Sequence, residues 1–236
     1  MNLGRSETVR LYMNEREVLC GYCGSDDKPI TRDHVIPKAL WKDAAMPSSP
    51  LTIPACRDCQ LFWDGETTYF RNIMVVQSDI DAHPALKRLL NGAISRRIKH
   101  SRPDFTDLTR NATPVWRQSQ AGFYIERGVK IEIDMARFQR TPEKIVRGLF
   151  FMRNQIVLPD DYEVRVFPNN SFWDDMGFQQ LLDQMDDWQG CGDDVFQMRA
   201  VRDGSDNNFT AWLLMFFKSS AIFAYTCPRS CGQNAA

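Results

Sequence analysis

The sequence predicts an α+β fold in which a small metal-clamped unit precedes a larger mixed domain. Two CxxC pairs, separated by 32 residues, indicate the clamp. A change from strand-like to helical spacing around the second pair indicates a strand–strand–helix unit. Alternating apolar residues in the C-terminal half indicate strands. We therefore expect an N-terminal unit (1–77), a basic helical connector (78–120) and a C-terminal α+β domain (121–236).

The N-terminal unit is expected to contain two strands followed by a helix, after a short lead-in over 1–16. Residues 31–37 fit a short strand that a proline ends, and residues 51–56 fit a second strand. After Cys59 the apolar residues recur at helical spacing, with an interruption at Gly65.

The connector and the C-terminal domain show both helical and strand-like spacing. Leucines and an isoleucine between residues 86 and 94 predict a helix. Thr141 and Pro142 fit the N-cap and the first residue of another helix. The other expected elements are a helix over 172–188 and strands over 123–133, 164–167, 195–201, 209–218 and 221–226.

The composition is that of a soluble globular protein. The chain has 236 residues, of which 43% are hydrophobic and 25% charged. No apolar run approaches the roughly 20 residues of a membrane span, and the first residues are too polar for a signal peptide. We therefore expect a cytoplasmic protein with no membrane partner. In such a reducing compartment, paired cysteines indicate metal ligands or redox groups rather than disulfides.

The formal net charge of −1 conceals an uneven distribution. Lys and Arg predominate over residues 76–150, and Asp and Glu predominate over residues 151–210. This pattern is compatible with a polyanionic partner held on one face, and equally with an ordinary solvated surface. The charge pattern alone leaves both open.

The two CxxC pairs are the strongest motif in the chain. Each pair alone could be a redox dithiol, but four thiolates together suit a tetrahedral Zn²⁺ that is structural, because no coordination position stays open. The predicted zinc ligands are Cys20, Cys23, Cys56 and Cys59. The loop between the pairs is longer than in a simple zinc ribbon, and it contains Asp33 and His34.

These motifs, taken together, resemble the zinc-containing branch of the HNH endonuclease family, whose fold is called ββα-metal. The resemblance covers about residues 18–75. It implies a metal-dependent endonuclease that hydrolyses phosphodiester bonds of nucleic acid, with double-stranded DNA as the expected substrate. It also implies a catalytic Mg²⁺ or Mn²⁺ and a local irregularity that brings two neighbouring side chains to the metal. The residues that carry it are Cys20-x2-Cys23, Asp33-His34-Val-Ile-Pro37 and Cys56-Arg-Asp-Cys59.

The residue chemistry agrees with such a site. The imidazole of His34, with an ordinary pKa of about 6.5, is suited to take a proton from water near neutral pH. Asp33 offers hard oxygen ligands to Mg²⁺ or Mn²⁺. Gln60 stands where the family has Asn or His, and Asp64 lies one helical turn further on the same face. We expect Gln60 or Asp64 to complete the metal site.

A second departure from the family is Ser49-Pro50, near the place of an asparagine that braces the catalytic loop. Because of the two departures, a catalytically degenerate zinc module that binds nucleic acid or a protein partner stays an alternative. Three basic residues flank the motif and could bind phosphates or be ordinary surface charges. They are Arg32, Lys38 and Arg57.

Other residues are expected to have no part in the chemistry. Trp41 and Trp63 are expected in the core, and His83 and His100 on the surface. The remaining cysteines lack metal-ligand spacing, and the acidic residues between 183 and 194 fit a solvated face. No motif names a ligand for the C-terminal domain, which could form a homodimer or contact a regulatory protein. The remaining cysteines are Cys191, Cys227 and Cys231.

Overall fold

The structure is a computed structural model, and it confirms the α+β class. It describes residues 19–26, 28–42, 46–96, 112–118, 124–167, 176–192 and 194–232. The expected lead-in and His100 lie outside the described residues. Among the described residues, no helix has the length and apolarity needed to cross a membrane.

The N-terminal unit has the expected order of two strands and then helix. Strand β1 (Ile30–His34) pairs antiparallel with β2 (Thr52–Cys56), with a short 3₁₀ turn, η1 (Lys38–Trp41), between them. Two helices follow, α2 (Arg57–Asp64) and α3 (Thr67–Gln77), so the expected interruption of the helix is confirmed. Strand β1 is shorter than predicted, because the chain turns directly after its last residue.

The connector begins with a helix, as its leucine spacing predicts. Helix α4 (Pro84–Leu89) continues into a π-helical turn, η2 (Leu90–Ile94). The expectation that His83 is a surface residue is wrong, because its side chain is buried. Its Nδ1 accepts a hydrogen bond from the backbone N–H of Ala85 at 3.1 Å and so caps α4.

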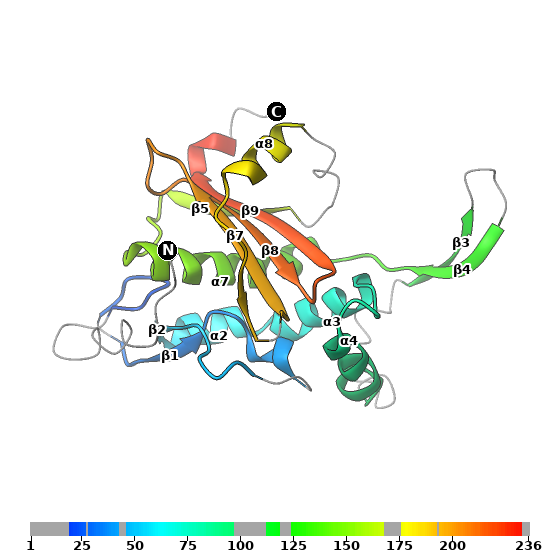
Figure 1. Cartoon of the computed structure of the whole chain (residues 1–236). Helices are drawn as coiled ribbons and strands as arrows, with labels where there is room; N and C mark the ends of the chain where they lie inside the picture. Colours follow the sequence, from blue (N-terminus) through cyan, green and yellow to red (C-terminus); the bar gives the residue numbers. More distant parts are fainter. Residues whose placement is uncertain are drawn as a thin grey trace.

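The connector is not helical throughout. Residues at its end form strand β3 (Thr113–Gln118), which pairs antiparallel with β4 (Tyr124–Lys130) in a hairpin. The strand predicted over 123–133 is therefore confirmed in its central part, and its partner strand was not predicted. The hairpin extends away from the rest of the molecule (Figure 1).

The C-terminal domain is built on a five-stranded antiparallel sheet with the order β5-β9-β8-β7-β6. Four of its strands were predicted. The short edge strand β6 was not. Within the described part of the helix predicted over 172–188, α8 forms and ends at Gln184, because the chain then leads into β6. The elements are β5 (Tyr162–Phe167), α8 (Met176–Gln184), β6 (Gln189–Cys191), β7 (Phe196–Arg202), β8 (Thr210–Phe216) and β9 (Ser220–Pro228).

Helix α7 (Met135–Asn154) starts earlier than predicted. Its N-cap is Asp134, whose carboxylate accepts a hydrogen bond from the backbone N–H of Arg137 at 3.2 Å. Thr141 and Pro142 therefore lie inside the helix, and the prediction that they begin it is wrong. Both are buried, which shows that packing outweighs the single backbone hydrogen bond that the proline removes.

The two faces of the five-stranded sheet are covered by different helices. Trp212, Leu214 and Phe216 belong to the main buried cluster, which also contains residues of α7. Leu213, one position out of phase, packs in a smaller cluster with Phe178 of α8. Helix α7 thus lies between the sheet and the unit formed by β1, β2 and α2 (Figure 1).

The main buried cluster is continuous across the three predicted segments of the chain. It contains Phe70 from the N-terminal unit, Leu86 from the connector and Phe138 from the C-terminal domain. Helix α7 approaches this unit closely at Gly148, where a Cβ atom would lie 2.8 Å from the side chain of Val35. The N-terminal unit, which ends at Gln77, therefore packs directly against a helix that begins only at Met135.

Candidate functional site

Four cysteines meet at one end of the N-terminal unit. Their sulfur atoms all lie within 4.8 Å of one another, and the Sγ atoms of Cys23 and Cys56 are 3.9 Å apart. A tetrahedral zinc ion with bonds of about 2.3 Å would space its sulfur ligands by about 3.8 Å. The predicted cluster of Cys20, Cys23, Cys56 and Cys59 could therefore hold a metal ion, and its four sulfurs fit zinc.

Local backbone structure explains why the sulfurs converge. The N–H of Gly24 donates to the carbonyl of Cys20 at 2.8 Å, and the positive φ of this glycine (73°) permits the tight turn. Cys56 ends β2 and Cys59 lies in the first turn of α2. The backbone N–H of Cys56 donates to the Sγ of Cys20 at 3.3 Å, which joins the two turns.

Without a cation, the negative charge of closely spaced thiolates is not balanced. Burial, followed by the charge of Cys20, raises the pKa of the Cys59 thiol well above its ordinary value. At Cys56, burial is outweighed by hydrogen bonds from the neighbouring cysteines, which lower the pKa of its thiol. A metal ion would stabilise every thiolate that binds it, including that of Cys59.

Asp33 lies beside the cluster and is almost completely buried, with 7% of its surface exposed. The hydroxyl of Tyr22 donates to its Oδ2 at 2.9 Å. Burial, followed by the charge of Asp33, raises the pKa of Tyr22, so this phenol stays protonated and acts as a donor. Tyr22 was not predicted as a site residue, although it lies between the two cysteines of the first pair.

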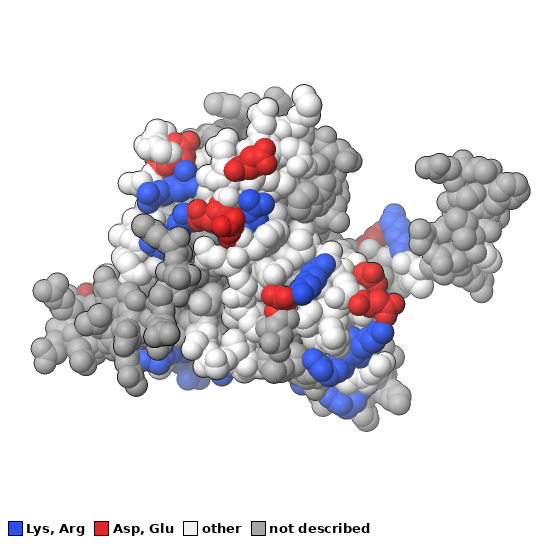
Figure 2. Space-filling view, in the orientation of Figure 1, with Lys and Arg blue, Asp and Glu red and all other residues white. Residues whose placement is uncertain are grey.

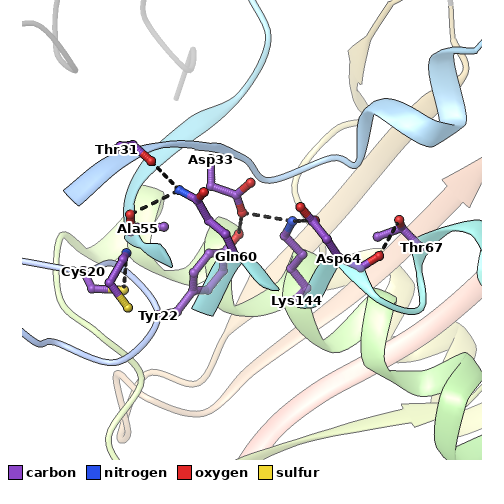
Figure 3. Close-up of polar contacts among 10 residues, drawn as sticks. Cys20, Tyr22, Thr31, Asp33, Ala55, Gln60, Asp64, Thr67 and Lys144 are labelled. Atoms are coloured by element: carbon purple, nitrogen blue, oxygen red, sulfur yellow. Dashed lines mark hydrogen bonds and ion pairs between the residues drawn. The ribbon is translucent and has the colours of Figure 1, made fainter. Parts of the chain in front are cut away.

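A lysine from α7 lies between the two acidic residues that the sequence singled out. The Nζ of Lys144 is 2.9 Å from Oδ2 of Asp33 and 2.8 Å from Oδ1 of Asp64 (Figure 3). The Lys144 side chain is 1% exposed, whereas that of Asp64 is 58% exposed. The structure therefore brings Asp33 and Asp64 together, as predicted, but through an ammonium group that the sequence did not predict.

Gln60 has a different neighbourhood from Asp64. Its Nε2 donates to the hydroxyl of Thr31 at 2.6 Å and to the carbonyl of Ala55 at 3.2 Å (Figure 3). The amide of Gln60 thus ties α2 to both β1 and β2. Its predicted role as a ligand of a catalytic cation stays a prediction.

His34 is the last residue of β1 and is partly exposed. Burial, followed by the positive charge of Lys38, lowers its pKa, while the charge of Asp33 acts in the opposite direction. Lys144 and Asp64 also act on it electrostatically, so His34 lies within range of the buried carboxylate–lysine network. Its imidazole is therefore neutral at pH 7 and can accept a proton.

Strand β1 shows no irregularity next to the histidine. Its pairing with β2 continues in register through Asp33 and His34, which lie opposite Ile53 and Thr52. In a regular strand two neighbouring side chains leave on opposite faces. The local irregularity that the resemblance implies is therefore absent from this described strand, and the two side chains approach a common region only because His34 stands at the end of β1.

The flanking basic residues lie at the surface around the network. Arg32, Lys38 and Arg57 are all exposed, from β1, η1 and the first position of α2. The expected burial of Trp41 and Trp63 is confirmed, at 3% and 7% exposure. These tryptophans stabilise the core rather than offering stacking surfaces.

Charge on the visible face of the molecule is mixed (Figure 2). Lys and Arg side chains gather over α4, whose last turn contains Lys87 and Arg88. Acidic residues lie beside them, and Lys87 is paired with Asp81. This face therefore carries no continuous basic surface among its described residues.

Comparison with known proteins adds no further identification. No protein-family model, no curated protein and no solved structure matches the chain.

Proposed function

We propose that this chain hydrolyses phosphodiester bonds of nucleic acid, with DNA as the expected substrate. One observation carries the proposal: His34 stands at the end of β1, directly after the buried Asp33 and within electrostatic range of Lys38 and Asp64. The same two-stranded unit holds, at its other end, a four-cysteine cluster that suits zinc. Phosphodiester hydrolysis needs an activated water and positive charge near the phosphate. The residues around His34 can supply both.

The proposed hydrolysis uses side chains that are exposed enough to contact a substrate. His34 takes a proton from water, and the resulting hydroxide attacks phosphorus while the bond to the leaving oxygen breaks. Lys38, whose positive charge already acts on His34, binds the phosphate oxygens and disfavours the protonated imidazole. Arg32 and Arg57 add positive charge at the surface of the same unit.

The zinc ion in this proposal is structural. Four thiolates occupy all four positions of a tetrahedral site, so the ion joins the turn before β1 to the end of β2 and the first turn of α2, and it takes no part in the hydrolysis. It holds in place the strand that ends in His34.

A divalent cation held jointly by Asp33, Gln60 and Asp64 does not fit the arrangement of the side chains. The ammonium of Lys144 lies within hydrogen-bonding distance of both carboxylates, and Tyr22 donates to the same oxygen of Asp33. We therefore derive no step of the reaction through Mg²⁺ or Mn²⁺. The test of function includes both ions because the family resemblance implies one of them.

Plasmid nicking tests the proposal. The zinc-loaded full chain is incubated with supercoiled DNA, with and without added Mg²⁺ or Mn²⁺, beside His34→Gln at the same zinc content. The parent is expected to nick the plasmid, and the variant to be slower by a factor of about 10² or more, because a positioned general base contributes about 10²–10⁴. Equal rates for parent and variant would remove His34 from the reaction.

A non-catalytic zinc module that binds nucleic acid or a protein is the second candidate function. The buried pairing of Lys144 with both carboxylates favours it, because this pairing leaves the acidic residues engaged. The same samples separate the two candidates. No nicking by parent or variant, together with DNA binding that Lys38→Ala weakens, supports the module.

A further inference from the structure

The most unusual group in the described part of the chain is the Lys144 side chain. Lysine is almost never fully buried unless it is paired, and this one is 1% exposed. Its Nζ lies 2.9 Å from Asp33 and 2.8 Å from Asp64. Figure 3 shows the ammonium between the two carboxylates, with the Tyr22 hydroxyl on the Asp33 oxygen that the ammonium also contacts.

We propose that Lys144 is the resident cation of this acidic pair. Its ammonium occupies the position that a divalent cation shared by Asp33 and Asp64 would take, so that Lys144 and such an ion exclude each other. The catalytic meaning of this exclusion rests on the proposed function, whereas the cation binding does not.

Charge balance supports this assignment. Two carboxylates and one ammonium leave a net charge of −1, and the Tyr22 hydroxyl disperses part of that charge. A divalent cation that entered beside Lys144 would meet a positive charge at close range in a poorly solvated place. An ion that displaced Lys144 would leave an unpaired ammonium among buried side chains, which is strongly unfavourable.

The position of the ammonium is fixed by backbone packing rather than by a flexible surface side chain. Helix α7 packs against α2 and β2, and it closely approaches the segment after β1 at Gly148, one turn after Lys144. A Cβ atom there would lie 2.8 Å from Val35, in the segment that follows β1. Lys144 cannot withdraw from the carboxylates unless its stem leaves this packed interface or the helix moves.

The pairing also makes Lys144 a positioning residue for Asp33. It holds one oxygen of this carboxylate toward α7, together with Tyr22. The next residue in β1 is His34, so α7 fixes the strand end on which the proposed base stands. The acidic site is thus completed by a helix outside the cysteine-rich segment.

Mn²⁺ binding by the zinc-loaded full chain, without nucleic acid, tests the proposal. Calorimetric titration and the paramagnetic resonance signal of free Mn²⁺ are followed for the parent and for Lys144→Met, which keeps most of the side-chain length and removes its charge. We expect the variant to gain one Mn²⁺ site at least about tenfold tighter than any in the parent, equivalent to about 1.4 kcal/mol. The added substitution Asp64→Asn is expected to abolish the gained site.

The matched control is Arg137→Met. Arg137 is on the same helix and forms an ion pair with Glu66 at 2.8 Å, but it does not join the two carboxylates of the site. This variant is expected to leave the Mn²⁺ affinity within about twofold of the parent. A tenfold gain in both variants overturns the proposal, because general loss of positive charge then explains the effect.

The parent chain decides the question if Lys144→Met does not fold. Asp64→Asn in the parent leaves Mn²⁺ affinity unchanged if the ammonium already excludes the ion. A loss of about tenfold or more shows that the carboxylates hold Mn²⁺ while Lys144 is present, and overturns the exclusion. Plasmid nicking plays no part in these readouts, so failure of the proposed function and failure of this proposal are separate outcomes.

Discussion

The N-terminal unit contains two groups of anionic side chains that differ in how their charge is balanced. The four cysteine sulfurs lie within 4.8 Å of one another, and the contacts described among them come from a backbone N–H and from the sulfurs themselves. In contrast, the ammonium group of Lys144 lies between the carboxylates of Asp33 and Asp64. The comparison indicates that the cysteine group could hold an external ion, whereas the carboxylate pair already has a cation from the chain itself.

This difference follows from the place of each group in the fold. The cysteines belong to two tight turns, and a bound metal ion would hold these turns together. The carboxylates face a long helix that is buried against a five-stranded sheet. That helix has enough packing of its own to deliver a charged side chain to a fixed point.

Removing the zinc ligand Cys56 is expected to have the largest effect. Structural zinc sites contribute apparent binding free energies of about 10–16 kcal/mol. Cys56→Ser should therefore lose zinc and expose the backbone of β1 and β2, because neither strand has another partner in its two-stranded sheet. Zinc per chain, measured by elemental mass spectrometry, and amide exchange in residues 30–56 report the two effects.

The control for this variant is Cys191→Ser, at a half-buried cysteine outside the cluster. It should keep the zinc content of the parent. Full zinc content and unchanged amide exchange in Cys56→Ser would show that the cluster does not bind the ion. The contrast between the cysteine cluster and the carboxylate pair would then no longer hold.

Breaking the buried lysine pair is expected to have the second-largest effect. Removing one partner of a buried ion pair costs about 3–5 kcal/mol. The Arg137–Glu66 pair is 31% and 17% exposed, and Arg137 also lies 4.2 Å from the centre of the Tyr69 ring. Its loss should cost about 0.5–2 kcal/mol, from a pair worth about 0–1 and a ring contact worth about 0.5–1.

Urea unfolding of Lys144→Met and Arg137→Met measures this difference as a change in the transition midpoint at equal slope. Equal losses of stability in the two variants would mean that burial does not increase the contribution of the Lys144 ion pair. The carboxylate pair would then resemble an ordinary surface ion pair.

Two glycines test the backbone approach that delivers the lysine, with effects of opposite sign. Gly148→Ala places a Cβ atom 2.8 Å from Val35, and such overpacking costs about 1–3 kcal/mol. Gly65 has helical dihedral angles (φ −55°, ψ −32°) and its Cβ would meet only the Leu61 carbonyl, at 3.9 Å. Gly65→Ala should therefore stabilise the chain by about 0.4–1 kcal/mol.

Thermal unfolding of both variants checks the signs. Both substitutions add the same methyl group. Stability changes of opposite sign would therefore be caused by the surroundings of the two glycines. Stabilisation by Gly148→Ala would show that α7 and the segment after β1 are less closely packed than their atoms indicate.

The sequence was informative where structure depends on local patterns. The two CxxC pairs predicted that four cysteines meet, and apolar alternation predicted most strands of the C-terminal sheet. Asp33 and His34 were identified because they lie between the cysteine pairs. Such features depend on residues that are close in the chain, and their physical causes are visible in short windows.

The sequence was uninformative where distant segments meet. Lys144 joins Asp33 across 111 positions, and its spacing from Thr141 and Gly148 on α7 was the available signal. Those three residues recur at three and four positions, and small or polar residues at that spacing permit a close helix approach. The predicted helix start at Thr141 concealed this pattern, because it placed the first of them outside the helix.

The smallest expected effect concerns an ion pair with the same chemistry in a solvated place. Lys218 lies 2.6 Å from Asp194, and the hydrogen bond from Lys218 is the main cause of the lowered pKa of this carboxyl. A carboxyl whose pKa is lower in the folded chain stabilises it above the unfolded pKa of about 3.9, and this contribution is lost as the pH falls through the folded value. Because both side chains are largely exposed, water and salt screen the pair.

Asp194→Asn should therefore reduce the loss of stability on acidification from pH 5 to pH 2, by an amount that high salt abolishes. Urea midpoints at low and high salt measure it for the parent and the variant. The Lys144 pair should keep its effect in high salt, because its ammonium is shielded from solvent. A salt-insensitive Asp194 contribution, or a salt-sensitive Lys144 contribution, would mean that solvent exposure does not distinguish these two ion pairs. The carboxylates paired with Lys144 would then exchange their cation with solvent as readily as Asp194 does.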